Sequence, residues 1–228
     1  MVVLKKMATV LVIGSNSFSG SHFINLLLRE TDYRIIGISR SPEKNNAFLR
    51  YKSQEACASR FQFQQLNLNH DVDKIIQLID QQVIEYVVNF AAQSEVAPSW
   101  KNPEHWYQTN VLALVRFLSQ LKERPFLKKY VHASTPEVYG TMSGVVTEHT
   151  HYNPSTPYAS SKAAADIFIQ MLVKNFGFPA VSTRVANIYG PGQQLFKIIP
   201  KAGMSIKLGK KIPLHGGGHS VRAFIHAH

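Results

Sequence analysis

The chain has 228 residues, of which 45% are hydrophobic and 17% charged, a composition typical of one folded globular domain and not of a disordered protein. The net charge is +11, but the basic residues are scattered, and their densest run, Lys207–Lys211, lacks interleaved aromatic side chains, so we predict no nucleic-acid partner. No apolar run approaches the ~20 residues of a membrane span, and the single cysteine, Cys57, excludes an internal disulfide and indicates a reducing, cytoplasmic setting.

The first predicted element is a strand over 8–13, which is short, apolar and rich in β-branched residues. A turn over 14–20 follows, bounded by two glycines, and an apolar helix over 21–28 comes next. Strand, glycine turn and helix in this order place a pyrophosphate on the helix N-terminus. Ser17 stands where such turns often carry a middle glycine, so the turn alone also fits an ordinary strand–helix connection.

The second predicted strand, 33–38, ends shortly before Arg40. At this point in dinucleotide-binding folds an acidic residue binds the ribose of NAD, whereas an arginine accommodates the 2′-phosphate of NADP. No carboxylate precedes Glu43 in this stretch, so Arg40 favours NADP, with NAD as the alternative. An ordinary solvated loop arginine explains the pattern equally well.

The rest of the chain continues to alternate strands with helices, which predicts a parallel, doubly wound α/β sheet with helices on both faces. The long helix after Pro98 has an apolar face that suits either the core or a dimer interface. Small residues follow the fourth strand, where they let a ligand approach the backbone. The predicted strands are 61–66, 84–91, 127–133 and 180–185, and the predicted helices are 72–82, 99–122, 156–176 and 196–208.

Four residues from two segments form the candidate catalytic group. Tyr158 and Lys162 stand four apart in a predicted helix and share one face, so an ammonium there is expected to lower the phenol pKa. Such a tyrosine can take a proton from an alcohol that loses a hydride. Thr135, at a strand end, could hold that alcohol, and Glu137 supplies a second base.

Six ordered motifs resemble the extended short-chain dehydrogenases/reductases that modify nucleotide-sugars. The form Thr-x-Glu-Val-Tyr-Gly at 135–140 is similar to the 4,6-dehydratase branch, and the whole set looks most like GDP-mannose and dTDP-glucose 4,6-dehydratases. The motifs are the loop 14–20, Asn89–Ser94, Ser134–Gly140, Tyr158–Lys162, Arg184–Pro191 and Val221–His226.

The resemblance implies a Rossmann-type NAD(P)-binding domain over 1–190 and the start of an incomplete nucleotide-sugar-binding lobe over 191–228. It also implies an internal redox cycle without a metal, which turns an NDP-hexose into an NDP-4-keto-6-deoxyhexose. Tyr158, aided by Thr135 and Lys162, would deprotonate the sugar O4 while C4 gives hydride to the nicotinamide. Glu137 would then remove the C5 proton, water would leave C6, and the hydride would return there.

The resemblance also assigns binding residues and an assembly. Family members commonly form homodimers through the helices that match 99–122 and 156–176. The substrate would contact Ser94, Thr135, Asn187 and Arg222. The cofactor, NADP or NAD, would contact Gly14, Asn16, Ser17, Phe18, Gly20, Arg40, Asn67, Leu68, Phe90, Ala91, Ala92, Tyr158 and Lys162.

Two departures keep other functions open. Pro136 stands where some dehydratases carry an acidic residue that helps water leave, and Ala223 stands where the family usually has aspartate. The alternatives are a related NDP-sugar epimerase, decarboxylase or reductase, and a non-catalytic protein that binds a dinucleotide.

Overall fold

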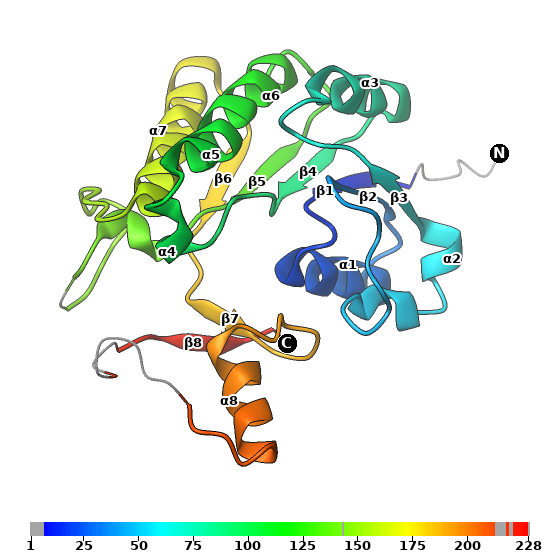
Figure 1. Ribbon diagram of the computed structural model, residues 1–228. Helices are drawn as coiled ribbons and strands as arrows, with labels where there is room; N and C mark the ends of the chain where they lie inside the picture. Colours follow the sequence, from blue (N-terminus) through cyan, green and yellow to red (C-terminus); the bar gives the residue numbers. More distant parts are fainter. Residues whose placement is uncertain (1–6, 143, 213–217, 219–220, 228) are drawn as a thin grey trace.

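A six-stranded parallel sheet forms the centre of the molecule in the computed structural model, which describes residues 7–142, 144–212, 218 and 221–227 (Figure 1). The strand order is β3-β2-β1-β4-β5-β6, so the winding reverses between β1 and β4. This confirms the predicted doubly wound sheet. The strands are β1 (Thr9–Ile13), β2 (Arg34–Ser39), β3 (Phe61–Gln65), β4 (Tyr86–Asn89), β5 (Lys129–Ala133) and β6 (Ala180–Thr183).

Helices cover both faces of this sheet. In Figure 1, α1 and α2 lie on one side, and α3, α6 and α7 lie on the other. None of the helices in the described part of the chain is both long and apolar enough to cross a membrane. The bounds are α1 (Phe18–Glu30), α2 (Cys57–Arg60), α3 (Val72–Gln82), α6 (Leu114–Leu121) and α7 (Pro157–Phe176), with short 3-10 helices η1 (Arg50–Ser53) and η3 (Pro136–Tyr139).

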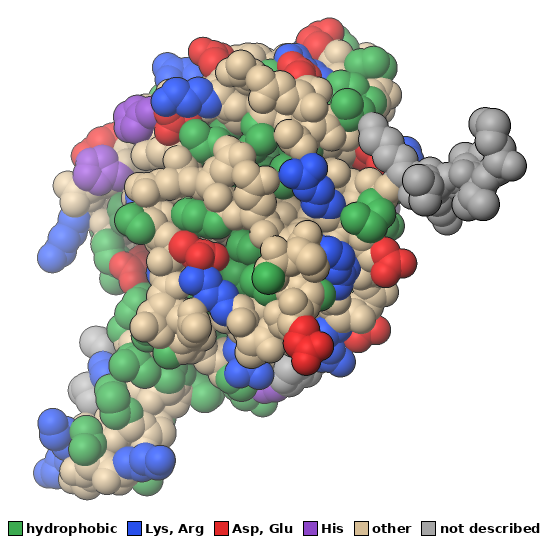
Figure 2. All heavy atoms as spheres, turned by 90° about the vertical axis from the view of Figure 1, so that its right-hand side faces the viewer, with side chains coloured by type: hydrophobic (Ala, Val, Ile, Leu, Met, Phe, Trp, Pro, Cys, Tyr) green, Lys and Arg blue, Asp and Glu red, His purple; other side chains and the backbone are tan. Residues whose placement is uncertain are grey.

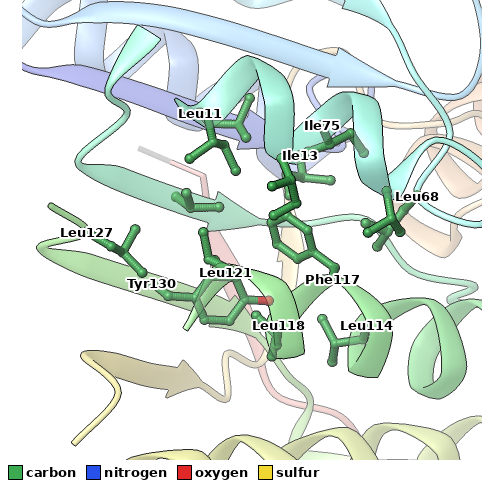
Figure 3. Close-up of a cluster of buried hydrophobic side chains, with 14 of the residues drawn as sticks. Leu11, Ile13, Leu68, Ile75, Leu114, Phe117, Leu118, Leu121, Leu127 and Tyr130 are labelled. Atoms are coloured by element: carbon green, nitrogen blue, oxygen red, sulfur yellow. The ribbon is translucent and has the colours of Figure 1, made fainter. Parts of the chain in front are cut away.

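The sheet separates two hydrophobic cores, and β1 contributes to both. Leu11 and Ile13 belong to the larger core, under α3 and α6, whereas Val10 and Val12 belong to the core under α1. Figure 3 shows Leu11 and Ile13 among the side chains of the larger core. All five residues of β1 are buried, as expected for a central parallel strand with helices on both faces.

The predicted helix over 99–122 is wrong in its details. The chain forms a short helix α4 (Val96–Ser99), breaks, and restarts at α5 (Pro103–Tyr107), which continues through a π-helical segment η2 (Gln108–Ala113) into α6. Pro103 at the first helical position explains the restart, because proline fits there without losing an intrahelical bond. Pro98, predicted to precede the helix, lies inside α4.

A second, smaller unit follows β6. Strands β7 (Asn187–Tyr189) and β8 (Phe224–His226) pair in parallel, and α8 (Ile198–Lys207) lies between them in sequence. Figure 2 shows hydrophobic and basic side chains together where this unit protrudes at the lower left. The His22 ring, on α1, contacts the carbonyl of Pro191 at 2.9 Å. A domain boundary at residue 190 remains a prediction.

Candidate functional site

A cavity of about 500 Å³ lies where the strand order reverses, at the carboxyl ends of β1 to β4. Open α/β sheets bind ligands at this position. Among the predicted residues, the cavity is lined by Gly14, Asn16, Ser17, Arg40, Asn67, Leu68, Phe90, Ala91, Ala92 and Ser94.

The turn after β1 brings its backbone close to the sheet. Gly14 has φ +86°, and a Cβ there would lie 2.7 Å from the nitrogen of Ala91. A Cβ on Gly20 would lie 2.4 Å from the carbonyl oxygen of Gly14, so this glycine lets α1 pack against the turn. Ser17 caps α1, since its hydroxyl accepts the N–H of Gly20 at 3.0 Å. The turn can therefore present the positive end of α1 to an anion.

Two predicted residues of this turn do not line the cavity. Phe18 is buried and its ring packs against His22, with centroids 4.6 Å apart. Its side chain is therefore part of the packing of α1, and the backbone N–H at the helix start is the group left to face an anion. Gly20 acts through its lack of a side chain.

The end of β2 carries two cations. Arg40 and Lys44 both line the cavity, and Lys44 belongs to no motif of the sequence. Asn16 holds the connecting loop, because its Nδ2 donates to the carbonyls of Ser41 at 3.1 Å and Pro42 at 2.8 Å. The cations are thus placed beside the turn after β1.

The end of β4 is held by Asn110, a residue of η2 that also belongs to no motif of the sequence. Its Oδ1 accepts the N–H of Gln93 at 2.8 Å, and its Nδ2 donates to the Gln93 carbonyl at 3.0 Å and to Ser161 Oγ at 3.0 Å. Asn110 is 4% exposed and so joins the cavity loop to α7. The sequence feature that indicates such a role for Asn110 is its position as a polar residue in an otherwise apolar helical stretch.

The cavity wall has unused hydrogen-bonding groups. Trp106 Nε1 and Asn69 Oδ1 are buried without a partner among the described residues, and both residues line the cavity. Buried polar atoms normally find a partner. A donor and an acceptor of this kind, together with the crowded Gly14 turn and the start of α1, fit a dinucleotide.

The predicted hydroxyl, phenol and carboxylate lie together at the end of β5, the neighbour of β4. The Thr135 hydroxyl and the Glu137 carboxylate both lie close enough to the Tyr158 phenol to act on its pKa, which Thr135 lowers and Glu137 raises. Thr135 is 7% exposed and also caps η3, where its Oγ1 accepts the N–H of Glu137 at 3.3 Å. The cap holds the backbone of Glu137 beside the Thr135 hydroxyl.

The predicted lowering of the Tyr158 pKa by Lys162 is wrong. Burial raises the pKa of Tyr158, and the Thr135 hydrogen bond opposes this in part. Lys162 instead donates to the carbonyl of Ala133 at 2.8 Å and contacts His132 Nε2 at 2.9 Å. Lys162 is 2% exposed, and burial lowers its pKa to about 8.

This shift predicts a pH-dependent stability. Between pH 8 and the ordinary lysine value of 10.5, the unfolded chain still binds the Lys162 proton while the folded chain has released it. The free energy of unfolding of wild type relative to Lys162→Met should therefore rise with pH across this window, by at most about 1.4 kcal/mol per pH unit. Urea unfolding at pH 8, 9 and 10 measures it. Lys174→Met, at an exposed lysine of α7, is the control, and a flat difference for Lys162→Met would contradict the prediction.

The predicted substrate residues occupy different places. Ser94 lines the cavity. Arg222 Nη1 lies 3.5 Å from Glu137 Oε1, so this guanidinium is beside the candidate base. Asn187 Nδ2 donates to the carbonyl of Ala223 at 3.1 Å and ties β7 to the residue before β8. Among the described residues, no group of three or more potential metal ligands occurs.

Comparison with known families gives one consistent result. The GDP-mannose 4,6-dehydratase family model matches residues 11–228. A relative from Arabidopsis thaliana, a trifunctional UDP-glucose 4,6-dehydratase/UDP-4-keto-6-deoxy-D-glucose 3,5-epimerase/UDP-4-keto-L-rhamnose-reductase, is 28% identical over 226 residues. That alignment covers 97% of this chain and 34% of the relative. The chain thus spans about a third of the length of this relative.

Two solved structures share the fold. A dTDP-glucose 4,6-dehydratase from Bacillus anthracis in complex with NAD is 31% identical, with a TM-score of 0.84 over 96% of this chain and 68% of that one. A UDP-glucuronic acid 4-epimerase from Bacillus cereus in complex with UDP-glucuronic acid and NAD is 28% identical, with a TM-score of 0.81 over 96% and 69%. Both are therefore similar to this chain over nearly all of its length.

Proposed function

The chain belongs to the GDP-mannose 4,6-dehydratase family, and we propose that it is an NAD(P)-dependent 4,6-dehydratase that converts an NDP-hexose to an NDP-4-keto-6-deoxyhexose. The observation that carries this proposal is the meeting of Thr135, Tyr158 and Glu137 at the end of β5. Simple alcohol oxidation needs one proton acceptor. A carboxylate beside the phenol supplies the second base that removal of a C5 proton requires.

The residues of the chain would act as follows. Thr135 donates to the sugar O4 and orients it toward the phenol. Tyr158, as a phenolate, takes the O4 proton, and Glu137 takes the C5 proton, which the neighbouring C4 ketone makes acidic. The proton that Tyr158 took balances the one that C5 regains when the hydride is delivered to C6. A nicotinamide cofactor, when bound, supplies the acceptor and later the donor of the hydride. Pro136 cannot donate a proton, so we assign protonation of the leaving C6 hydroxyl to Glu137 once it has taken the C5 proton.

The substrate would lie between the cavity and the second unit. Ser94 is proposed to contact the sugar, and Arg222 and Asn187 the diphosphate, for which a guanidinium offers paired donors. The position of Arg222 beside Glu137 supports this, since it places a cation next to the proposed reaction centre. We propose that residues 1–190 form the NAD(P)-binding domain and that residues 191–228 contribute to sugar-nucleotide binding.

The proposed cofactor is NADP, with NAD as the alternative. The nucleotide would lie along the cavity, with its pyrophosphate at the start of α1 and its adenosine between the ends of β2 and β3. Arg40 and Lys44 support the 2′-phosphate assignment, because both line the cavity where the adenosine ribose would lie and no carboxylate precedes Glu43 there. The nucleotide-dependent chemistry and the single thiol support a cytoplasmic location.

Replacing Arg40 by alanine should weaken NADP binding about 10- to 100-fold and leave NAD binding nearly unchanged, because a charge-assisted bond to the 2′-phosphate is lost. Fluorescence titration with both dinucleotides measures this. Arg29→Ala, at an exposed arginine of α1, is the matched control. Equal losses for NAD and NADP would reject the 2′-phosphate role.

The reaction is tested by incubating the purified chain with GDP-mannose and with UDP-, CDP- and dTDP-hexoses, and by detecting 4-keto products through their absorbance in alkali. A 6-deoxy-4-keto product from wild type, lost in Glu137→Gln, is expected. A C4-epimerised sugar would favour the epimerase. Saturable dinucleotide binding without product from any donor would favour a non-catalytic binding protein.

We propose a homodimer formed through the outer faces of η2 and α7. Leu112 on η2 and Ile167 and Met171 on α7 are apolar and exposed by 49%, 57% and 44%. Exposed apolar side chains on neighbouring helical segments are a candidate interface. Sedimentation equilibrium tests this, and a monomer at micromolar concentration would contradict it.

A further inference from the structure

A buried row of polar side chains connects the cavity to Lys162. Asn89 Oδ1 accepts the N–H of Ala91 at 2.9 Å, and Asn89 Nδ2 donates to Tyr130 Oη at 3.1 Å. Tyr130 Oη lies 3.2 Å from His132 Nδ1, and His132 Nε2 lies 2.9 Å from Lys162 Nζ. The four side chains are at most 2% exposed, so water does not compete for these groups. The mechanism proposed above assigns no step to any of these four side chains.

His132 is a neutral imidazole in this row. Burial, with the nearby charge of Lys162 and then Arg184, holds the pKa of His132 well below its ordinary value. A neutral ring carries one hydrogen, on either Nδ1 or Nε2. Asn89 already donates to the Tyr130 oxygen on one side of the ring, and Lys162 contacts the ring on the other side. The position of the imidazole hydrogen must therefore suit both Tyr130 and Lys162.

Two arrangements satisfy the Lys162 amine. When Lys162 is an ammonium, it donates to Nε2, and the imidazole hydrogen is on Nδ1, directed at Tyr130 Oη. When Lys162 is a neutral amine, Nε2–H donates to the nitrogen lone pair, and the Tyr130 hydroxyl donates to Nδ1. The bond from Lys162 to the carbonyl of Ala133 is kept in both. The second arrangement holds one proton fewer, which has gone to solvent.

We propose that His132 is a positioning residue for Lys162, changing tautomer as Lys162 changes charge so that the amine stays hydrogen-bonded and in place in both states. Two other charged side chains act on this pair. Asp166, one turn further along α7, favours the ammonium, whereas Arg184 disfavours any charge on the imidazole. Lys162 is therefore the member of the pair that titrates, near pH 8, and His132 follows it without becoming charged.

The consequence for catalysis rests on the proposed function. Lys162 lies one helical turn from Tyr158, so an amine that is held in both charge states keeps the same position relative to the phenol as protons move during turnover. Without His132, the neutral amine would lose its hydrogen-bond donor and could leave this position.

The test uses the wild-type chain without substrate, so its outcome is independent of the proposed reaction. Imidazole ¹⁵N shifts report the tautomer of each histidine, and ¹³Cε shifts of labelled lysine report the charge of Lys162. Lys162→Met assigns both signals, since it removes the lysine resonance and perturbs the His132 ring. We expect His132 to change from the Nδ1–H to the Nε2–H tautomer with the same midpoint pH as Lys162. A single tautomer throughout the Lys162 titration, or different midpoints, would overturn the proposal.

A variant series provides a second readout. In His132→Leu the ammonium loses an acceptor, so the Lys162 midpoint should fall by about one pH unit, and His132→Gln should restore it through its amide oxygen. Val131→Ala, on the opposite face of β5, is the control and should leave the midpoint unchanged. A Lys162 midpoint that moves no more in His132→Leu than in Val131→Ala would show that His132 is a packing residue.

Discussion

Replacing Tyr158 by phenylalanine is expected to lower turnover about 10²- to 10⁴-fold while cofactor affinity stays close to that of wild type. The change removes the proton acceptor but keeps the ring, which the start of α7 holds beside Thr135. Turnover is measured with the sugar nucleotide that wild type accepts, and cofactor affinity by fluorescence titration.

Tyr107→Phe provides the matched control for this variant. Its hydroxyl donates to Ser160 Oγ at 2.8 Å, so a phenol oxygen is removed next to the same helix but away from Thr135. We expect its turnover to remain near the wild-type value. Near-wild-type turnover in Tyr158→Phe would remove the proposed acceptor and with it the mechanism.

Asp166→Ala is expected to lower the free energy of unfolding by about 3–5 kcal/mol, because it leaves a largely buried guanidinium without its partner. Asp166 is fully buried, and its Oδ2 accepts from Arg184 at 2.8 Å and from Ser134 Oγ at 2.7 Å. Arg184 also lies against the rings of Tyr139 and Tyr152, 5.3 Å from each centroid. The cluster thus joins α7 to the ends of β5 and β6. Urea unfolding monitored by circular dichroism measures the loss.

Glu85→Ala serves as the control, because the Glu85–Lys128 pair, at 2.6 Å, is far more exposed. Solvent screens such pairs, so a much smaller loss is expected. If Asp166→Ala cost no more than Glu85→Ala, the buried cluster would not stabilise the fold. Since Ser134 directly precedes Thr135, we expect Asp166→Ala also to loosen the catalytic loop.

Two kinds of pattern in the sequence predicted the strands of the sheet and the residues of the candidate site. The β-branched run at Thr9–Ile13 and the glycine turn after it are local signals, and they correctly predicted a central strand and a strand–helix connection. The motifs at 134–140 and 158–162 named side chains that the fold brings to one place, because the first follows β5 and the second lies at the start of α7, which packs against η3. The roles of these side chains remain proposals.

Other features depended on contacts that the sequence does not display. The division of the predicted helix at 99–122 and the bridging role of Asn110 depend on what this segment packs against. Lys44 becomes a cavity residue because Asn16, 28 positions earlier, holds its loop. A periodic pattern predicts that a helix forms, but it does not predict which neighbour each side chain meets.

The amino-acid sequence by itself determined the alternation of strands and helices in the central sheet and the residue types of the candidate reactive groups, since both depend on local periodicity and on residue type. The tertiary structure decided the pKa values of Tyr158 and Lys162 and the pairing of Lys162 with His132, 30 positions away. The physical reason is that burial and hydrogen bonding govern the cost of a charge, and both arise only when distant segments pack together.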